Sequence, residues 1–395
     1  MSKYMFSKRL ALGGILISLL LNGCASVWES ESDKKLRPAE LEDVANSLPI
    51  RQLWKKSIGN VIDGERLKLV PAFSGGILFT ADREGVVEAH DGVTGKTLWK
   101  QDTGVALSSG PGVGDGVVLV GTHEADLIAL DERSGKEKWR TKLSSELLSV
   151  ARADRGIAVA YTVDGRLHGR SSADGRPVWV YDRPTPTLTL HGSSSPVVSE
   201  GRVICGFANG KLVALNIITG DVLWDASVTL PTGRTDLERM VDIDGDPVIK
   251  SGVVFVATYQ GDLAAISEES GTVFWRKKLS SHAGVDVSWR MVFTSDDEDH
   301  VWAVDPRSGS SVWKNNGFTN RRITAPTVFG DYLLVGDLEG YIHWISQQDG
   351  KVVARSRLGS DPISIAPVVY GKVAFVLGDD GDLSAYTLDE KVTAE

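Results

Sequence analysis

Three carboxylates stand at alternate positions of one segment, at Asp242, Asp244 and Asp246, and the Ca²⁺-binding loop of an EF-hand uses the same spacing. The rest of that loop is missing, because Pro247 takes the place of its turn glycine and Val253 the place of its bidentate glutamate. We therefore predict no metal site here. Asp242 and Asp244 are instead candidates for contacting a partner from a surface loop, and an ordinary solvated loop is the alternative.

Other reactive groups lack the neighbours that their chemistry needs. The acidic runs at 296–299 and 379–382 are typical of solvated hairpin turns, and the seven histidines form no pair at metal-ligand spacing. The glycines of 110–114 lack the strand and helix of a phosphate-binding loop, and the serines of 193–195 lack a Gly-x-Ser-x-Gly elbow. We expect no catalytic, cofactor-binding or metal-binding residue, so the chain is predicted not to be an enzyme.

The first of the two cysteines, Cys24, ends a segment with the features of an export signal. Three cationic residues precede an apolar run at 10–21, which is too short to span a bilayer. The letters LNGC at 21–24 resemble the bacterial lipoprotein signal. This resemblance implies that residues 1–23 are removed, that Cys24 carries a covalent lipid, and that the mature protein sits at the periplasmic face of the outer membrane. A plain secretory signal with an incidental cysteine is the alternative.

The mature chain is strongly acidic. Removing residues 1–23 takes away three positive charges, so the net charge falls from −9 to −12, which argues against a nucleic-acid partner. Residues 24–48 are predicted to be the lipidated cysteine and a flexible tether, with a short helix over 38–46 as a possibility. Residues 390–395 are predicted to be a C-terminal tail. The second cysteine, Cys205, stands in an apolar strand and is expected to be a buried small hydrophobe.

One repeat accounts for most of the remaining chain. A small residue is followed ten residues later by Trp, with Gly four residues before that Trp, at intervals of 38 to 51 residues. Each copy also contains an apolar run of strand formers and a strand of the type Gly-x-Leu-x-Ala-x-Asp, separated by turn residues. Repeats of this length built from short strands predict a propeller or a solenoid.

The two ends of the repeat region complement each other. Eight strands of the Gly-x-Leu-x-Ala-x-Asp type are present, and the last, at 381–387, has no Trp strand after it. The segment 50–55 (IRQLWK) resembles the Trp strand at 95–100 (GKTLWK) and can complete that blade. We predict an all-β fold, an eight-bladed β-propeller of four-stranded antiparallel blades over residues 49–389. The N-terminal strand around Trp54 completes the last C-terminal blade and removes exposed edges.

The repeated tryptophans are expected to dock neighbouring blades, because an indole offers a flat apolar face and an N–H for a backbone acceptor. Ligand stacking is the alternative. The seventh copy has Ala354 in the Trp position, so a weaker contact is expected there unless Trp344 fills the gap. The predicted structural Trp-docking residues are Trp54, Trp99, Trp139, Trp179, Trp224, Trp275 and Trp313.

The unit Ala-x-Asp-x-x-Thr-Gly-x-x-x-Trp resembles the docking repeat of quinoprotein (PQQ-type) dehydrogenases. Together with the lipoprotein signal, the segments 186–192, 236–247 and 336–344 make nearly the whole chain similar to the BamB family, lipoproteins of the outer-membrane β-barrel assembly machinery (BAM complex). The resemblance implies a non-catalytic scaffold without a cofactor. It would bind the POTRA domains of the central subunit BamA, reach other BAM subunits through BamA, and assist insertion of barrel proteins, with unfolded outer-membrane proteins as candidate clients.

The same resemblance places partner contacts in two connections, at Leu188, Leu190 and His191 and at Asp242 and Asp244. The family usually has Arg where His191 stands, and a histidine that is mostly neutral near pH 7 supplies no permanent charge. The sequence itself also indicates a binding role for the second connection. This connection lies in the longest interval of the repeat, and long loops on a rigid scaffold often carry binding residues. The alternative for both leucines is that they face inward as ordinary strand residues.

Other functions stay open at this point. A PQQ-dependent dehydrogenase would need Ca²⁺ ligands, an Asp base and, in several families, a disulfide between adjacent cysteines. This chain has no adjacent pair of cysteines. A periplasmic propeller lipoprotein of a different envelope complex would keep the ring and the anchor without needing segments 186–192 and 236–247. Open blade edges could also bind extended client strands by β-augmentation, although nothing in the sequence selects one edge.

Overall fold

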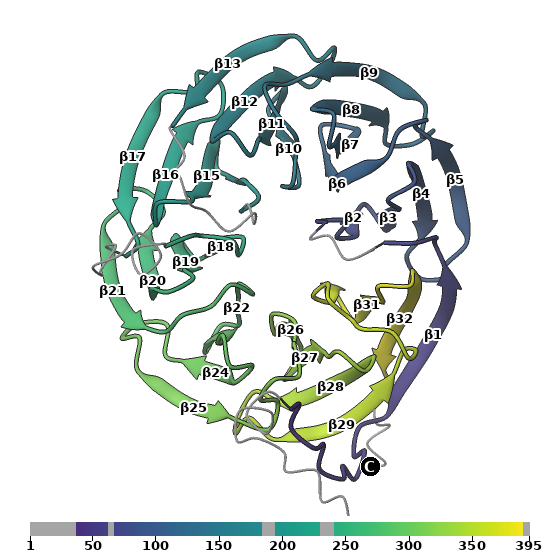
Figure 1. The fold of residues 1–395 in the computed structure, drawn as a ribbon, viewed down its shortest axis with the longest axis vertical. Helices are drawn as coiled ribbons and strands as arrows, with labels where there is room; N and C mark the ends of the chain where they lie inside the picture. The colour runs from purple at the N-terminus through teal and green to yellow at the C-terminus, as the bar shows by residue number, and fades with distance from the viewer. Residues whose placement is uncertain (1–36, 62–66, 184–193, 230–240, 390–395) are drawn as a thin grey trace, which may run out of the picture. The chain divides into compact units, whose positions relative to one another are not determined.

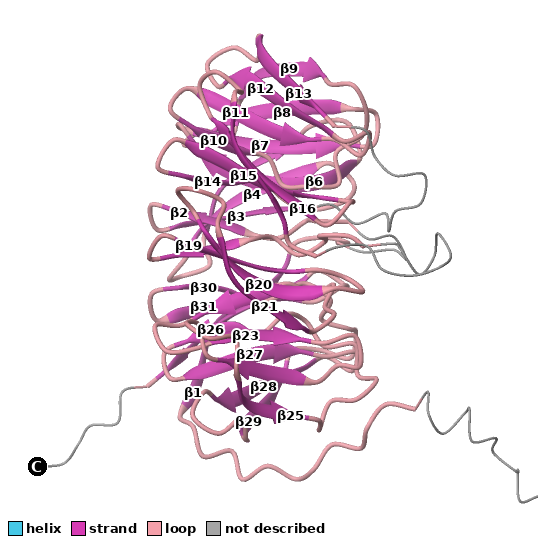
Figure 2. Ribbon diagram, turned by 90° about the vertical axis from the view of Figure 1, so that its left-hand side faces the viewer, coloured by secondary structure: helices cyan, strands magenta, loops and turns pink. Residues whose placement is uncertain are grey.

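The computed structural model describes residues 37–61, 67–183, 194–229 and 241–389, and every regular element in these ranges is a strand (Figure 2). The strands form eight four-stranded sheets arranged around a ring (Figure 1). The predicted eight-bladed β-propeller is therefore confirmed. Among the described residues, no helix has the length and apolar character needed to cross a membrane.

Each blade begins with its innermost strand and ends with its outermost strand (Figure 1). Blades 1 to 4 are β2 (Ala72–Ser74), β3 (Ile77–Ala81), β4 (Val86–Asp91) and β5 (Thr97–Asp102); β6 (Leu107–Gly114), β7 (Val117–Thr122), β8 (Asp126–Asp131) and β9 (Glu137–Lys142); β10 (Arg152–Asp154), β11 (Ile157–Tyr161), β12 (Arg166–Ser171) and β13 (Pro177–Asp182); and β14 (Val197–Ser199), β15 (Arg202–Phe207), β16 (Lys211–Asn216) and β17 (Val222–Ser227).

Blades 5 to 8 follow the same plan. They are β18 (Val248–Lys250), β19 (Val253–Ala257), β20 (Asp262–Ser267) and β21 (Val273–Lys278); β22 (Val285–Val287), β23 (Val292–Ser295), β24 (Val301–Val304) and β25 (Ser311–Asn315); β26 (Thr327–Phe329), β27 (Tyr332–Gly336), β28 (Tyr341–Ser346) and β29 (Val352–Arg357); and β30 (Val368–Tyr370), β31 (Val373–Leu377), β32 (Asp382–Leu388) and β1 (Ile50–Ser57).

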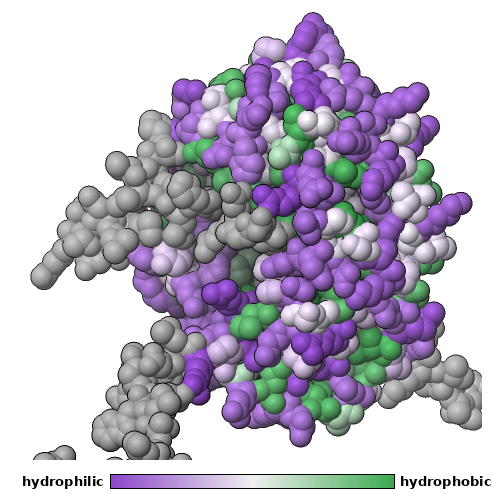
Figure 3. Space-filling model, turned by 45° about the vertical axis from the view of Figure 1, so that its right-hand side comes forward, coloured by the Kyte–Doolittle hydropathy of each residue, from purple (hydrophilic) through white to green (hydrophobic). Residues whose placement is uncertain are grey.

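Hydrophobic burial explains which strands lie inside each blade. The second and third strands carry continuous apolar runs and are covered on both faces by the neighbouring blades, as in β7, where all six residues are buried. The outer strands alternate instead between exposed and covered positions, as in β13. The side of the molecule shown in Figure 3 is mainly hydrophilic, and its apolar side chains gather in small separate groups.

The repeated tryptophans link each blade to the next. On β5, Trp99 pairs with the small residue Ala89 of β4, and its ring lies against the turn glycine of blade 2, Gly135. Its indole Nε1 donates to the backbone oxygen of Glu132 in the same turn, at 3.0 Å. The other six, at Trp54, Trp139, Trp179, Trp224, Trp275 and Trp313, make the same bond to the next blade at 2.8–3.2 Å.

Blade 7 exchanges the two residues of this pair. Trp344 of β28 pairs with Ala354 of β29, so the large side chain is on the third strand and the small one on the fourth. Trp344 is fully buried, meets the Phe329 ring edge-on at 5.5 Å, and packs with Ala374 and Val376 of blade 8. Trp344 therefore fills the gap that Ala354 leaves.

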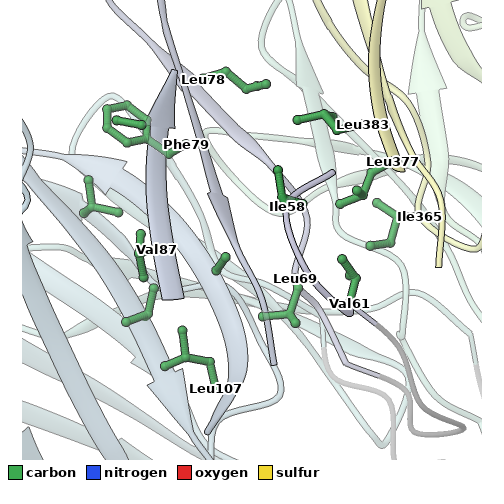
Figure 4. Packing of buried hydrophobic residues seen from close by; sticks show 14 of the residues in the cluster. Ile58, Val61, Leu69, Leu78, Phe79, Val87, Leu107, Ile365, Leu377 and Leu383 are labelled. Atoms are coloured by element: carbon green, nitrogen blue, oxygen red, sulfur yellow. The ribbon is translucent and has the colours of Figure 1, made fainter. Parts of the chain in front are cut away.

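Blade 8 closes the ring by joining the two ends of the chain. β1 pairs antiparallel with β32 over its whole length, so the predicted N-terminal closing strand is confirmed (Figure 1). Ile58, Val61 and Leu69, which lie in the connection from β1 to β2, pack between apolar side chains of blades 1 and 8 (Figure 4). Because β32 and β1 come from opposite ends of the chain, blade 8 has no hairpin between its third and fourth strands.

Residues 38–48, which we call the strap, lie along blade 7 and form no helix. At one end, Arg321 donates to the backbone oxygen of Ala39 at 2.8 Å, and its guanidinium is held by the buried carboxylate of Asp337. At the other end, Asn46 Oδ1 accepts from the backbone N–H of Arg355 at 2.7 Å, and the Ser47 N–H donates to the oxygen of Val353 at 3.0 Å. The strap thereby covers the outer edge of β29.

Candidate functional site

The two segments singled out in the sequence belong to the connections before and after blade 4, and the described ends of these connections lie on one face of the ring. In every blade, the link to the next blade leaves from the same face as the hairpin between the second and third strands. We call this the connection face. The hairpin between the first and second strands of each blade lies on the opposite face, as does the hairpin between the third and fourth strands of blades 1 to 7. The connections 183–196 and 228–247 enter and leave blade 4 on the connection face.

The predicted residues of the first connection, Leu188, Leu190 and His191, lie outside the described residues, as does Cys24. Asp242 and Asp244 are described, and only 1% and 7% of their surfaces are exposed. In this conformation neither offers a partner much surface, and whether they contact one stays a prediction.

The backbone around these two aspartates is held by blades 4 and 5. The Tyr259 N–H donates to the backbone oxygen of Asp242 at 2.8 Å, and the two residues form an isolated antiparallel bridge. Between the aspartates, Ile243 is fully buried against Gly206, where a Cβ on the glycine would come within 2.3 Å of the isoleucine side chain. Residues 242–244 thus form the fixed end of the second connection.

The third carboxylate of the segment, Asp246, ties the two connections together. Its Oδ1 accepts a hydrogen bond from the backbone N–H of Ser195 at 2.6 Å, and the Lys68 ammonium lies 2.9 Å from the same oxygen. Burial acts to raise the pKa of Asp246, but Lys68, the Ser195 N–H and the nearby Arg152 outweigh burial and lower it. Sequence reasoning missed Asp246 as a site residue, because its partners are 51 and 178 positions away.

The Lys68–Asp246 contact also bridges the ring. Lys68 precedes the first strand of blade 1 and Asp246 precedes the first strand of blade 5, and these are opposite blades. The Lys68 backbone is fixed by a parallel bridge to Ser109, and its ammonium also reaches the backbone oxygen of Asp244 at 3.2 Å. We call Lys68 and Asp246 the axial pair.

The axial pair bears on whether a quinone cofactor fits this propeller. A flat cofactor seated in the central funnel would need the space between opposite blades that the axial pair spans, and both charged groups already bind each other. The residues present do not fit a quinone at that level of the funnel. Across residues 37–61, 67–183, 194–229 and 241–389, no group of three or more His, Cys, Asp or Glu side chains could hold a metal ion.

The free thiol of Cys205 is buried in β15, inside the core shared by blades 3 and 4. Burial raises the pKa of the thiol, so the group stays protonated and unreactive at neutral pH. The expectation of a small buried hydrophobe is confirmed.

Comparisons with known proteins agree with this arrangement. A family model described as "Outer membrane protein assembly factor BamB" matches residues 83–315. A protein of that name from Alkalilimnicola ehrlichii is 41% identical over 97% of this chain and 98% of its own. The one from Pseudomonas aeruginosa is 38% identical over 95% of this chain and 97% of its own.

Solved structures show the same fold. The crystal structure of BamB from Moraxella catarrhalis has a TM-score of 0.78 at 25% identity and covers 86% of this chain and 99% of that one. A quinohemoprotein alcohol dehydrogenase from Comamonas testosteroni has a TM-score of 0.68 at 13% identity, covering 90% of this chain and 79% of that one, and this likeness concerns the fold alone. From the family match and the near-complete coverage of its relatives, this chain belongs to the family of outer membrane protein assembly factor BamB.

Proposed function

We propose that this chain is a non-catalytic scaffold subunit of the outer-membrane β-barrel assembly machinery. Its relatives carry the name of an outer membrane protein assembly factor, and the match runs over nearly the whole length of both chains. In this proposal the lipid on Cys24 attaches the protein to the outer membrane from the periplasmic side, and the propeller presents a fixed surface to its partners. Attachment by lipid suits the acidic mature chain, which gains no electrostatic attraction to anionic lipids.

The partner surface in this proposal is the connection face around blade 4. It binds the POTRA domains of BamA through Leu188, Leu190 and His191 of the first connection and through the second connection with Asp242 and Asp244. The observation that carries the proposal is the 2.6 Å hydrogen bond from the Ser195 N–H to Asp246, because it fixes the ends of both connections relative to each other.

Such a tie matters for binding because ordering a loop costs free energy when the partner arrives. Each immobilised side chain costs about 0.5–1.5 kcal/mol, so two connections anchored in advance lose less on binding than free ones. The burial of Asp242 and Asp244 fits this role, since they belong to the base of the second connection and fix where it emerges. In this proposal, other residues of the two connections make the direct contacts.

The test compares three variants in a co-purification assay with the periplasmic domains of BamA. Leu188→Ala/Leu190→Ala removes the predicted apolar anchor, and Asp246→Asn weakens the tie without adding bulk. Val93→Ala/Ile218→Ala is the matched control, because both side chains are exposed, at 68% and 47%, in hairpins of the opposite face.

We expect the first variant to lose most of the bound partner, the second to bind several-fold more weakly, and the control to bind as the parent does. Far-UV circular dichroism and thermal unfolding check that every propeller is intact. Unchanged capture by an intact Leu188→Ala/Leu190→Ala variant, or loss of capture in the control, would place the interface elsewhere.

A further inference from the structure

The strap sets where the N-terminal part of the chain is joined to the ring. Ala39 donates to the backbone oxygen of Thr319 at 2.9 Å and accepts from Arg321 at 2.8 Å. Thr319 and Arg321 belong to the link between blades 6 and 7, which lies on the connection face. From there the strap runs along β29 to the opposite face, where β1 begins beside the end of β32 (Figure 2). The chain before the strap is therefore joined to the ring at the connection face.

Ring residues fix the guanidinium that binds the strap. Arg321 is buried, its Nε and Nη2 donate to the carboxylate of Asp337 at 2.9 and 2.8 Å, and Nη2 also meets Glu339. The remaining Nη1 donates to the strap. On either side of it, Asn320 and Arg322 adopt positive φ angles of 59° and 50°, which are uncommon for residues with a side chain. Backbone strain of this kind persists where the surrounding contacts hold a residue in a required position.

Between its two ends the strap is loosely packed. Leu41 and Val44 are only half-buried, and a cavity of about 440 Å³ separates residues 41–44 from ring residues such as Lys314 and Phe318. The hydrogen bonds at the two ends therefore carry the attachment. The strap contributes no strand to the eight described sheets, so its release leaves these sheets in place.

The strap also shortens the chain that is available to a lipid anchor at Cys24. Fifteen positions separate Cys24 from Ala39, and a chain of that length spans at most about 50 Å. Without the strap contacts, the ring first holds the chain at Pro49, whose backbone oxygen accepts from the N–H of Asp389 on the opposite face. Twenty-five positions then separate the anchor from the ring, a span of up to about 85 Å. The strap contacts therefore change both the reach of the tether and the face from which it starts.

We propose that the strap positions the lipid anchor: bound to blade 7, it makes the tether start at the connection face and keeps that starting point within about 50 Å of the membrane. The inference rests on the proposed function for the lipid on Cys24 and for the membrane. The proposed partner surface around blade 4 lies on the same face, so the strap limits how far from the bilayer that surface stands. Arg321 is a positioning residue, because it acts through the strap.

The test measures the orientation of the lipidated protein on vesicles of phosphatidylethanolamine and phosphatidylglycerol that carry an acceptor dye on the lipid. A donor dye is attached at one of two exposed positions of blade 7, Ser360→Cys on the connection face or Gln348→Cys in the hairpin of the opposite face. The six residues of β29 between these positions span about 20 Å, a difference that energy transfer resolves. Cys205 is buried and takes no label.

Ala39→Pro/Asn46→Ala releases the strap without changing the ring. The first substitution removes the N–H that is bonded to Thr319, and the second removes the Oδ1 that accepts from the N–H of Arg355. Alanine is also strained at position 46, where φ is 45°. Faster hydrogen exchange of the Arg355 amide confirms release, and far-UV circular dichroism confirms that the sheets are intact.

Two further variants separate the length of the tether from the face at which it starts. The released variant is also made without residues 27–36, so that fifteen positions separate Cys24 from Pro49 and only the starting face differs from the parent. Glu40→Gln/Ala45→Ser is the matched control, because both residues are exposed in the strap.

We expect the parent and the control to transfer about two-fold more energy from position 360 than from position 348. Release should weaken transfer from both positions, and the shortened released variant should reverse their order. Equal transfer from the two positions of the parent, or an unreversed order in the shortened variant, would overturn the proposal. Unchanged exchange of the Arg355 amide on release would refute the clamp itself.

Mass analysis of the N-terminal residue and capture of the periplasmic domains of BamA are measured in parallel. A Cys24 without lipid would overturn the proposed anchor and this inference together. A lipidated protein that captures BamA, but whose orientation does not depend on the strap, would overturn this inference alone.

Discussion

The exchanged pair in blade 7 gives a quantitative test of how the blades dock. Trp344→Ala removes a fully buried indole from the contact between blades 7 and 8. Truncating a buried Trp to Ala costs about 3–5 kcal/mol of the free energy of unfolding, and a rigid blade junction can collapse little around the cavity. The bond from Trp344 Nε1 to Ser356 Oγ is long, at 3.3 Å, so its loss adds little.

The informative variant restores the common order of the pair, Trp344→Ala/Ala354→Trp. At the seven other junctions the fourth-strand indole lies against a turn glycine of the next blade and donates to a carbonyl of that turn. Blade 8 has no such hairpin, because β32 and β1 come from opposite ends of the chain. A Trp at 354 would also meet Leu48, which packs in the same cluster. An indole N–H buried without an acceptor costs about 1–3 kcal/mol.

We therefore expect the double variant to recover at most half of the loss, leaving it at least about 1.5–2.5 kcal/mol less stable than the parent. Urea unfolding followed by far-UV circular dichroism measures this difference, with the m-value as a check on cooperativity. The matched control is the reverse exchange at the preceding junction, Ala303→Trp/Trp313→Ala. We expect this variant to be less stable than the parent, because it removes an indole that packs on a turn of blade 7 and donates a hydrogen bond to it. A blade 7 double variant as stable as the parent would refute the reasoning.

Four further outcomes follow from the described contacts. Asp246→Asn should lower the free energy of unfolding by about 1–3 kcal/mol, because the axial lysine loses a charged partner; a double-mutant cycle with that lysine replaced by Met should show coupling in the urea midpoints. Burial is the main reason that the pKa of His90 and that of His168 are lowered to about 4 in the folded protein. Between pH 6.5 and 4 the unfolded chain therefore binds more protons at these two histidines than the folded protein does. Stability should therefore fall as pH drops through that window, by up to about 3 kcal/mol for each histidine, and replacing both by Gln should flatten the profile. Gly220→Ala should cost more than Gly252→Ala in thermal unfolding, since both need a φ of +76° but only the first would press a Cβ against an indole at 2.7 Å. Added PQQ and Ca²⁺ should leave no bound chromophore after desalting, because the axial pair spans the funnel; a retained chromophore would contradict that reading.

The sequence predicts the ring well because the same contact between neighbouring blades is encoded again in each repeat. A small residue, a turn glycine and a Trp at fixed spacing recur in copy after copy, and the pairing of Ala89 with Trp99 shows why each is needed. The closing strand around Trp54 follows from the same count, since a blade that lacks its outer strand at one end of the chain must find it at the other. Local pattern is sufficient wherever a contact is made by residues of one repeat and the next.

Contacts between distant segments escape such reasoning. Nothing near Asp246 in the sequence indicates that its carboxylate meets the Ser195 N–H and Lys68, because only ring closure brings blades 1, 4 and 5 to one axis. The strap is similar, since Arg321 reaches the backbone of Ala39 across 282 positions.

These features divide the molecule into a part that is fixed and a part that is available. Seven indole contacts, one exchanged pair and the axial pair hold the blades, so that the ends of both connections around blade 4 stand at defined positions. Rigid presentation of loops lowers the ordering cost of binding a folded partner. In the proposed function, a folded partner therefore meets both connections at defined positions, without any movement of the ring.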